Sequence, residues 1–442
     1  MAKMPKRPPG IASPDRQLAL GPEEFLALLE VVPGPTVDGR YLHWDKLIYR
    51  EPPAGLSHED WWSALKLHRT VLYKRLPLQD RGGQPCKYLE TDLIREELHR
   101  LDFDAGGQIG VPGRIPSESG DRYYIGSLME EAITSSQLEG AATTRQVAKE
   151  MIRSGRAPQD RSEQMILNNF LTMRRIAELK DRPLTKTLVF DIHRLITADT
   201  LNDPSAAGRF RVSDEPVCVV DDRDRAVHIP PPAEQLEKRM AAMCKFANAE
   251  APFIHPVVRS IILHFWLAYD HPFVDGNGRT ARALFYWSML RHDYWLLEFL
   301  SISSVILKGP AKYGRAFLYT ETDENDLTYF IIYHMEVIRR AIKQLHEYIA
   351  RKAKQLKAVE ARLRAAPILN HRQRALLSHA LRHPDHRYTI RSHRTSHNVV
   401  YQTARTDLLD LAERGLLTAV KIGKTWYFTP VKGLEEKLGE LR

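Results

Sequence analysis

Apolar positions recur with a helical period along most of the chain, and the pattern is clearest near its middle. The apolar run Ile261–Tyr269 is long enough for a buried helix. A second helical pattern opens at Arg279 and continues through the letters LFYWSML. Between the two lies a short segment that contains Pro272 and the glycine-rich sequence Gly276–Gly278. The pattern therefore predicts two buried helices joined by a tight turn.

The flanking sequence is also mainly helical in pattern, with one exception. Residues 123–144 form a helical pattern that Gly140 stops, and residues 161–199 form two helices with a start signal at Pro183. Residues that favour strands, Val217–Val220 and Ala226–Ile229, lie on either side of a polar turn and predict a short hairpin. A further helical pattern, rich in Lys and Arg, runs from Ile338 to about Ala366 and predicts a solvated connector or a dimer helix.

The N-terminal part predicts a loose tail followed by a small helical segment. Residues 1 to about 20 are rich in Pro, Lys and Arg. The sequence Ser57–Asp60 is a helix-capping signal ahead of an apolar periodic run. Three tryptophans are expected to be core anchors because aromatic side chains dominate core burial; they are Trp44, Trp61 and Trp62. Residues 103–120 are rich in Gly, Pro and Ser and predict a linker or surface loop.

The C-terminal part, from about residue 368 to residue 442, has a different character. Helical patterns, a capped helix that ends at Gly415 and a predicted hairpin with Gly423 at its turn follow in an order that resembles a winged helix-turn-helix. Its basic residues would suit phosphate contacts on DNA; they are Arg382, Arg387, Arg391, Arg394 and Arg405. Many modules of this kind only dimerise or dock other proteins, so the pattern leaves the partner open.

Composition places the chain among globular proteins. Hydrophobic residues make up 43% and charged residues 27%, which excludes a disordered or membranous chain. Three widely spaced cysteines exclude a disulfide framework and a cysteine-based zinc site, and they fit a reducing compartment. The basic N-terminus lacks the apolar core of a signal peptide, so a cytoplasmic protein without a membrane span is expected. The net charge of +9 favours partners that carry phosphate or acidic groups.

The glycine-rich turn carries the clearest chemistry in the sequence. A glycine turn that feeds a helix N-terminus offers backbone N–H groups and a positive dipole end to an anionic phosphate. Arg279 and Arg282 lie three residues apart, so both guanidinium groups reach the same side of the helix. Asp275 could hold Mg²⁺ against phosphate oxygens. His271 is the nearby side chain suited to proton abstraction. Together these residues indicate nucleotide transfer.

The whole stretch HPFVDGNGRTAR, His271–Arg282, resembles the core motif of the Fic family, HPFx(D/E)GNGRxxR, at every specified position. The resemblance implies transfer of AMP from ATP to a protein Ser, Thr or Tyr hydroxyl. It implies His271 as the general base and Asp275 as the Mg²⁺ ligand. It also implies a phosphate cradle and an arginine pair at the β/γ end of the triphosphate; these residues are Gly276, Asn277, Gly278, Arg279 and Arg282.

A second motif lies upstream of the first. Ser135, Glu139 and Gly140 match the pattern (S/T)xxxE(G/N), which Fic proteins use as an inhibitory segment. Ser135 and Glu139 are four residues apart, so they lie on one helix face. If that face meets the active site, the Glu139 carboxylate can pair with the Arg282 guanidinium and withhold it from the γ-phosphate. The alternative is an ordinary exposed glutamate.

The resemblance reaches two further segments. The hairpin at 217–229 corresponds to the family's flap, beside which the target side chain is positioned, and an exposed strand edge could hold a target peptide by strand addition. Tyr313 lies where the family often has a tyrosine near adenine, but the usual second aromatic is Gly314 here. This departure weakens the assignment of Tyr313 to nucleotide binding, and simple packing is the alternative. His193 is left unassigned.

The sequence therefore predicts a mainly α protein with a Fic-type helical core and a β-hairpin flap, followed by a winged helix-turn-helix. The expected domains are residues 1–120, 121–350 and 368–442. The expected function is protein adenylylation, with self-modification, and with ATP as substrate and Mg²⁺ as cofactor. Two alternatives remain: a Fic enzyme that transfers another group or removes AMP, and a DNA-binding regulator whose core senses nucleotide. The sequence leaves open whether the protein is a homodimer.

Overall fold

The structure is a computed structural model, and it describes residues 3–9, 30–53, 55–106, 117–220, 225–365, 368–384, 386–423 and 425–440. The chain divides into two compact units. The larger unit comprises residues 1–113 and 123–342, and the smaller unit comprises residues 114–122 and 343–442. The described part is mainly helical, as the apolar periodicity predicts.

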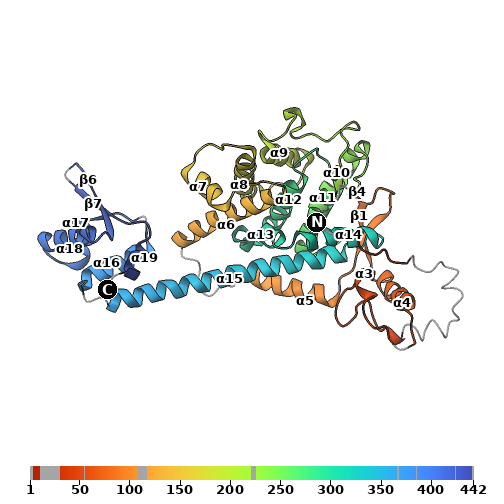
Figure 1. The fold of residues 1–442 in the computed structure, drawn as a ribbon, viewed down its shortest axis with the longest axis horizontal. Helices are drawn as coiled ribbons and strands as arrows, with labels where there is room; N and C mark the ends of the chain where they lie inside the picture. Colours follow the sequence, from red (N-terminus) through yellow and green to blue (C-terminus); the bar gives the residue numbers. More distant parts are fainter. Residues whose placement is uncertain are drawn as a thin grey trace. The chain divides into compact units, whose positions relative to one another are not determined.

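The centre of the larger unit is a pair of buried helices, α11 (Pro256–Asp270) and α12 (Asn277–Arg291). They pack along each other, and α8 (Arg161–Leu179) and α9 (Lys186–Thr197) pack against α12 (Figure 1). Helix α11 is buried along nearly its whole length, and most of its side chains are apolar. The predictions of two buried helices around the glycine-rich turn, and of two helices within 161–199, are confirmed.

Further helices complete this unit around the central pair. Their bounds are α6 Ser117–Leu138, α7 Arg145–Ser154, α10 Leu236–Asn248, α13 Ile302–Leu307, α14 Pro310–Thr322 and α15 Thr328–Ala365, with 3-10 turns at Pro204–Ala206, Ala233–Gln235 and Trp295–Phe299. Helix α6 already begins at Ser117, and residues 102–106 form a turn of π-helix. The prediction of a loop over 103–120 is therefore wrong at both described ends, and residues 107–116 lie outside the described residues.

The N-terminal segment contributes α3 (Trp44–Leu47), α4 (His58–Thr70), β1 (Lys74–Gln79), β2 (Pro85–Tyr88) and α5 (Asp92–Leu101). The predicted cap of α4 is present, since the Asp60 N–H donates to the Ser57 hydroxyl at 3.1 Å. Trp61 and Trp62 are buried as predicted, and Trp44 is half-buried against them. The antiparallel hairpin of β1 and β2 was not predicted, because Pro77 and several charged residues obscure its alternation.

This segment is fastened to the core by buried polar contacts. The Lys66 ammonium of α4 lies 2.8 Å from a carboxylate oxygen of Asp323, and both side chains are almost fully buried. The Tyr329 hydroxyl of α15 also donates to Asp323, at 2.8 Å. Buried charges that are paired in this way fix one arrangement of the elements that carry them.

Two short antiparallel strands form the predicted hairpin, which we call the flap: β3 (Val219–Val220) and β4 (Ala226–His228). Val219 pairs with His228 and Val220 with Ala226. The turn at residues 221–224 lies outside the described residues. Figure 1 shows β4 near α11 and α14.

The described residues of the smaller unit include four complete helices and a three-stranded sheet. The elements are α16 His371–Arg382, β5 Tyr388–Thr389, α17 Ile390–His397, α18 Tyr401–Glu413, β6 Leu417–Ile422, β7 Thr425–Pro430 and α19 Leu434–Glu440. The strand order is β5-β7-β6, and all pairs are antiparallel. Fully buried Leu377, Leu408 and Phe428 join helices and sheet in one small core. The order of helices followed by the β6–β7 hairpin is the predicted one, and the likeness to a winged helix-turn-helix stays a prediction.

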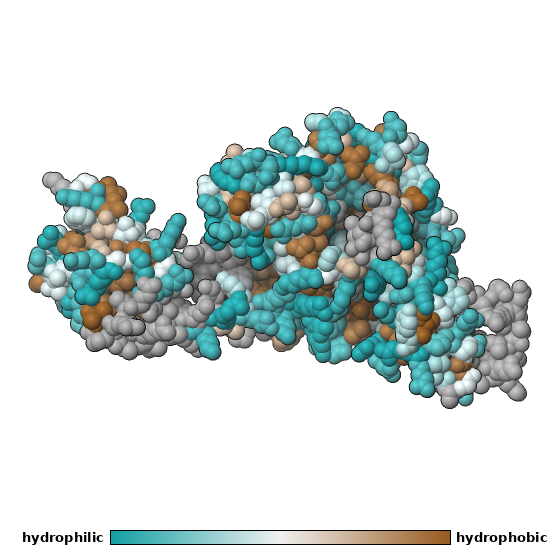
Figure 2. All heavy atoms as spheres, in the orientation of Figure 1, coloured by the Kyte–Doolittle hydropathy of each residue, from teal (hydrophilic) through white to brown (hydrophobic). Residues whose placement is uncertain are grey.

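Hydrophilic residues cover most of the molecular face in Figure 2, and the apolar ones form small separate patches. Within the residues that the structure describes, every helix is too short or too polar to cross a membrane.

Candidate active site

The loop between α11 and α12 is locked by its own polar groups. His271 ends α11 in the left-handed conformation (φ 44°, ψ 56°), and its N–H donates to the Leu267 carbonyl at 3.0 Å. The Asn277 side chain accepts from the Phe273 N–H at 3.0 Å and donates to the Phe273 carbonyl at 2.7 Å. Gly276, with φ +82°, starts α12. The segment is therefore held in one conformation by contacts within a few residues of each other.

His193 of α9 packs against this loop and supports it. Its ring stacks on Phe273 with centroids 3.7 Å apart, and its Nδ1 accepts from the Gly208 N–H at 2.9 Å. The proton therefore lies on Nε2, which donates to the Asp275 carbonyl at 2.9 Å. Burial lowers the pKa of His193 to about 4, so the ring is neutral. This histidine, which the sequence left unassigned, is a structural support of the loop.

His271 itself has the geometry of a base. Its Nδ1 lies 3.2 Å from the Ala268 carbonyl, an acceptor, so Nδ1 carries the proton and Nε2 keeps a free electron pair. Burial lowers the pKa of His271 to about 4, against the opposing influence of that carbonyl. The Arg211 Nε donates to the His271 carbonyl at 2.9 Å and fixes the backbone behind the ring. At neutral pH the imidazole is thus uncharged, with its proton on Nδ1, and held in one orientation.

Beside this base lies a concentration of groups that need an anion. The N-terminus of α12 presents its free amides at Asn277 and Gly278. Arg279 is fully buried; its Nη1 donates to the Ile196 carbonyl at 3.0 Å. Within the described part of the chain, its Nε and Nη2 have no hydrogen-bond partner. Buried donors of this kind are costly unless a ligand satisfies them.

Arg282 is also buried, but its guanidinium is occupied. Its Nη2 donates to the Glu139 carboxylate at 2.8 Å and to the Ser135 carbonyl at 3.0 Å, and its Nε donates to the Ser135 hydroxyl at 2.8 Å. Burial opposes the charge, yet the Glu139 carboxylate outweighs it and raises the pKa of Arg282. The pair between Glu139 and Arg282 that the sequence predicted is therefore present.

The Glu139 carboxylate also lies over the start of α12. A Cβ atom built on Gly278 would come within 2.1 Å of its Oε1. The carboxylate thus fills the space that a glycine leaves open above the helix N-terminus, where an anion is favoured. Gly140, with φ +91°, turns the chain directly after it.

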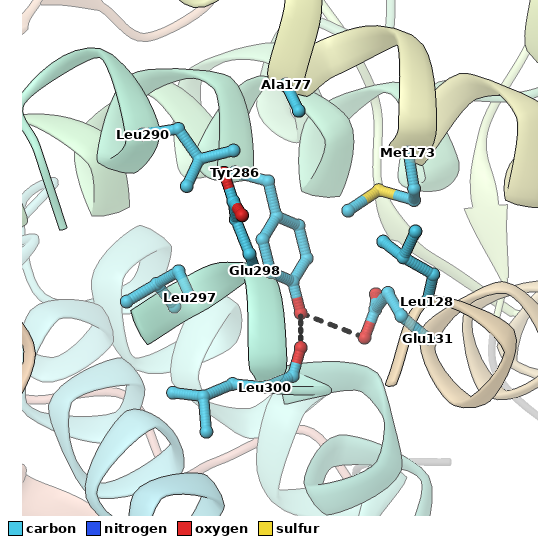
Figure 3. Close-up of a pocket in the computed structure, with 9 residues that line it drawn as sticks. All are labelled: Leu128, Glu131, Met173, Ala177, Tyr286, Leu290, Leu297, Glu298 and Leu300. Atoms are coloured by element: carbon cyan, nitrogen blue, oxygen red, sulfur yellow. Dashed lines mark hydrogen bonds between the residues drawn. The ribbon is translucent and has the colours of Figure 1, made fainter. Parts of the chain in front are cut away.

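Helix α6 is anchored beneath Glu139 by a second carboxylate, Glu131, which is 1% exposed. It accepts from the Tyr286 hydroxyl at 3.0 Å, the Ser301 hydroxyl at 2.9 Å and the Ser303 N–H at 3.0 Å. Figure 3 shows Glu131 and Tyr286 at the edge of a cavity whose other lining residues are mostly apolar. Its space for the centre of a water molecule is about 10 Å³, room for roughly one water.

Asp275 lies at the mouth of the site and is partly exposed. One of its oxygens lies 3.1 Å from the Arg161 Nη2, and Arg161 also donates to the Thr200 carbonyl at 2.9 Å. The other oxygen lies 3.8 Å from the Arg279 Nη2. No pattern in the sequence indicated Arg161, which begins α8 and lies 114 residues from its partner.

Tyr313 of α14 lies near Arg282 rather than in an open pocket. Its hydroxyl is 2.9 Å from the His264 Nε2. Burial raises the pKa of Tyr313 to about 12, against the influence of the neighbouring Arg282 guanidinium. These contacts place it at the border of the arginine site and leave its predicted contact with adenine a prediction.

Comparison with known proteins identifies this region. Residues 183–289 match the Fic/DOC family. A protein adenylyltransferase Fic of Nematostella vectensis is 28% identical over 207 residues, which is 46% of this chain and 46% of that protein. A protein of the same name from Culex quinquefasciatus is 35% identical over 107 residues, 24% of this chain and 19% of its own length. The chain thus spans less than half the length of these curated relatives.

A solved structure agrees at the level of the fold. The crystal structure of a Fic family protein from Desulfovibrio desulfuricans G20 has a TM-score of 0.51 and 19% sequence identity, and the match covers 77% of this chain and 96% of that one. Its identity is too low to carry more than the fold. The matched family segment contains α9, the flap, α11, the loop and most of α12. Residues 183–289 of this chain are a Fic domain.

Proposed function

We propose that this protein transfers AMP from ATP to a hydroxyl group on a protein side chain, Ser, Thr or Tyr. The observation that carries the proposal is the free Nε2 of a neutral, oriented His271 beside an anion-seeking helix N-terminus. The names of the curated relatives, protein adenylyltransferase, support the same activity.

The phosphates of ATP would take the groups that still lack an anion. The amides at the start of α12 suit phosphate oxygens, as do the Nε and Nη2 of Arg279, which make no hydrogen bond among the described residues. Arg282 would bind the terminal phosphate once Glu139 leaves it. Tyr313, beside Arg282, would border the nucleotide.

The residues present also fit Mg²⁺. Mg²⁺ keeps several waters and is bound by one or two carboxylates together with substrate phosphates, rather than by a cage of protein ligands. Asp275 is a single, partly exposed carboxylate at the edge of the anion site. Among the described residues, no group of three or more His, Cys, Asp or Glu could hold a metal. When bound there, Mg²⁺ would neutralise charge on the phosphates.

The transfer depends on the neutral state of His271, which leaves Nε2 free to accept a proton. Its Nε2 takes the proton of the target hydroxyl, and the oxygen attacks the α-phosphorus. A new phosphorus–oxygen bond forms while the bond from the α-phosphorus to the bridging oxygen breaks, so AMP stays on the protein and pyrophosphate leaves. The Ala268 carbonyl, which accepts from Nδ1, holds the ring in this orientation throughout.

We further propose that Glu139 is a brake on this reaction. Its carboxylate occupies both Arg282 and the space above Gly278. The terminal phosphate must therefore compete with an anion already in its place, and ATP binds in an unproductive pose.

A labelling experiment tests the reaction. The Glu139→Gly protein is incubated with Mg²⁺ and ATP that carries its label on either the α- or the γ-phosphate. The proposal expects protein-bound label from the α-phosphate alone, and a mass gain of one AMP group. Label from the γ-phosphate, or a different mass gain, would instead indicate another transfer. Loss of AMP from a pre-labelled protein would indicate removal.

A second candidate function, DNA binding, is favoured by the smaller unit. Arg391, Arg394 and Arg405 of α17 and α18 are all exposed. If they contact DNA phosphates, replacing all three with alanine will weaken duplex binding at low salt and lower its salt dependence by about three in the logarithmic slope. Unchanged affinity of the triple variant would exclude this role. The same unit could instead form a homodimer.

A further inference from the structure

His228, the last residue of the flap strand β4, makes contacts that a neutral histidine cannot satisfy. Its Nε2 lies 2.7 Å from the Tyr269 carbonyl in the last turn of α11. Its Nδ1 lies 2.8 Å from the Glu321 carboxylate of α14. A carbonyl and an ionised carboxylate only accept hydrogen bonds, whereas a neutral imidazole has one N–H to donate. Both contacts are complete only in the imidazolium.

The surroundings of His228 stabilise that charge. The residue is 9% exposed, and burial alone would disfavour a cation. The hydrogen bond and charge of Glu321, the Tyr269 carbonyl and the charge of Asp270 outweigh burial and raise the pKa of His228 above 6.5. The titratable and charged groups around it are Glu321 on α14, Tyr269, Asp270 and His271 on α11, and Arg239 of α10, which pairs with Asp270.

Two histidines near the end of α11 therefore have opposite protonation. His271 is neutral, with its pKa lowered to about 4, and the charge of His228 contributes to that lowering. His228 lies between two acceptors that favour its imidazolium form, and its pKa is raised. Neighbouring groups whose pKa values are shifted in opposite directions are suited to different roles. His271 has the geometry of a base, whereas His228 hydrogen-bonds to two elements, α11 and α14, and has no place at the reacting atoms.

The other attachment of the flap does not titrate near neutral pH. Past His228 the chain reaches Pro231, whose carbonyl accepts from the Arg211 Nη2 at 2.5 Å. The same guanidinium holds the His271 carbonyl through Nε. An arginine stays charged at every physiological pH. The base of the flap is thus permanently attached next to the catalytic histidine, while the strand above it depends on His228.

We propose that His228 is a cationic clasp that holds β4 against α11 and α14, and that loss of its proton releases the flap strand. A released histidine has the ordinary pKa of 6.5, and the clasped one has a raised pKa. The stabilisation is therefore complete below pH 6.5 and is lost as the pH rises through the raised value. His228 is a positioning residue, since it acts through the strand that it holds.

The meaning of the clasp for catalysis rests on the proposed function. If the edge of the flap receives a target segment by strand addition, an ordered β4 presents that edge beside His271. Rising pH would then raise the KM for the protein target without changing the state of His271, which is already neutral. The clasp itself can be tested without any nucleotide or target.

Backbone hydrogen exchange on the full chain tests the clasp directly. Peptides that cover Ala226–His228 are followed from pH 6 to pH 9, with rates corrected for intrinsic exchange. In the interval above pH 6.5 and below the raised pKa, protection of β4 should fall by up to about tenfold for each pH unit, because one proton is released on opening. Protection in α9 should stay constant over the same range. Protection of β4 that does not change with pH would overturn the proposal.

Two variants and one control sharpen the test. Glu321→Gln and His228→Gln should both give β4 a low protection that no longer depends on pH. His255→Gln is the matched control, because His255 also pairs with a carboxylate, Asp102, at 3.0 Å but accepts an N–H at its other nitrogen. It should leave the wild-type profile intact. A Glu321→Gln profile like that of the wild type would contradict the clasp.

A direct titration covers the case in which a variant fails to fold. Histidine side-chain NMR of the wild-type protein should find a pKa above 6.5 for His228, assigned by the signal lost in His228→Gln or by its neighbours. A value below 6.5 would overturn the clasp. Neither readout uses ATP, so a failure of AMP transfer would contradict only the proposed function, and a failure here would contradict only the clasp.

Discussion

The loop that carries His271 and the elements that lie over it are built in different ways. Within the loop, contacts join residues four or fewer positions apart, such as Asn277 with Phe273. The covering contacts span much greater distances in sequence: 143 residues from Glu139 to Arg282, and 114 from Arg161 to Asp275. The loop is therefore held by these local contacts together with two supports, His193 and Arg211, whereas each covering contact depends on one or two charged groups. Under the proposed function, the loop would carry the chemistry, and the covering contact of Glu139 would control it.

The largest effect on AMP transfer is expected from a change in the loop, at His271. In the Glu139→Gly background, His271→Ala should lower AMP transfer by about 10²–10⁴-fold, because the general base is lost. ATP affinity should change little, since the phosphate-binding groups remain. Transfer is measured as α-label on protein, and ATP affinity by calorimetry.

The matched control for this change is His255→Ala. His255 caps the other end of α11, roughly 20 Å from His271 by the rise of a 15-residue helix. It should leave transfer unchanged. If His271→Ala transfers AMP as well as its parent does, the base has been assigned to the wrong residue.

The second largest effect comes from the covering contact itself. Glu139→Gln keeps the size of the side chain but removes the charge that pairs with Arg282. A hydrogen bond between charged groups contributes about 1.5–3 kcal/mol, so transfer should rise roughly 10- to 150-fold over the wild type. Steady-state labelling rates at saturating ATP measure the change. Equal rates for both proteins would show that the pair does not limit transfer.

A smaller effect is expected where α6 is anchored. Glu131→Gln replaces a buried acceptor that receives four donors, so one or more of the groups from Tyr286, Ser301 and Ser303 lose a partner. The free energy of unfolding of the larger unit should fall by about 1–3 kcal/mol. Urea denaturation measures it. Glu96→Gln, which changes an exposed carboxylate paired with Arg100, is the control and should alter stability by less than about 0.5 kcal/mol.

The smallest effect is expected at the mouth of the site. Arg161 and Asp275 form an exposed ion pair, and such pairs contribute about 0.2–1 kcal/mol. Arg161→Ala should therefore raise the affinity of the nucleotide-free protein for Mn²⁺, a probe for Mg²⁺, by up to about fivefold. Electron paramagnetic resonance of free Mn²⁺ measures it. Asp275→Asn should abolish binding at this site, and unchanged Mn²⁺ affinity in that variant would remove Asp275 as a metal ligand.

The sequence predicted the loop and its two flanking helices well, because the sequence patterns that indicate them are local. Apolar periodicity places α11 and α12, and the glycines between them require a turn at a helix N-terminus. The approach of Glu139 to Arg282 was also predicted, through a motif with a fixed spacing of four residues from Ser135. The other contacts that depend on tertiary packing are not marked by any such motif.

Three such contacts could not be predicted. Arg161 meets Asp275 because α8 packs against α12, and Glu131 anchors α6 through Tyr286 of α12 and through Ser301 and Ser303. No sequence pattern distinguishes His228 from the other histidines. Its charge follows from the acceptors on two distant elements.

The central claim is that Glu139 holds the arginine that the terminal phosphate of ATP needs. Calorimetric titration of wild-type and Glu139→Gln proteins with ATP and with ADP tests it most directly. The account predicts that the wild-type protein binds both nucleotides with similar affinity, since Arg282 is occupied. Glu139→Gln should bind ATP more tightly than ADP, by about tenfold or more. The same ratio of ATP to ADP affinity in both proteins would contradict the account.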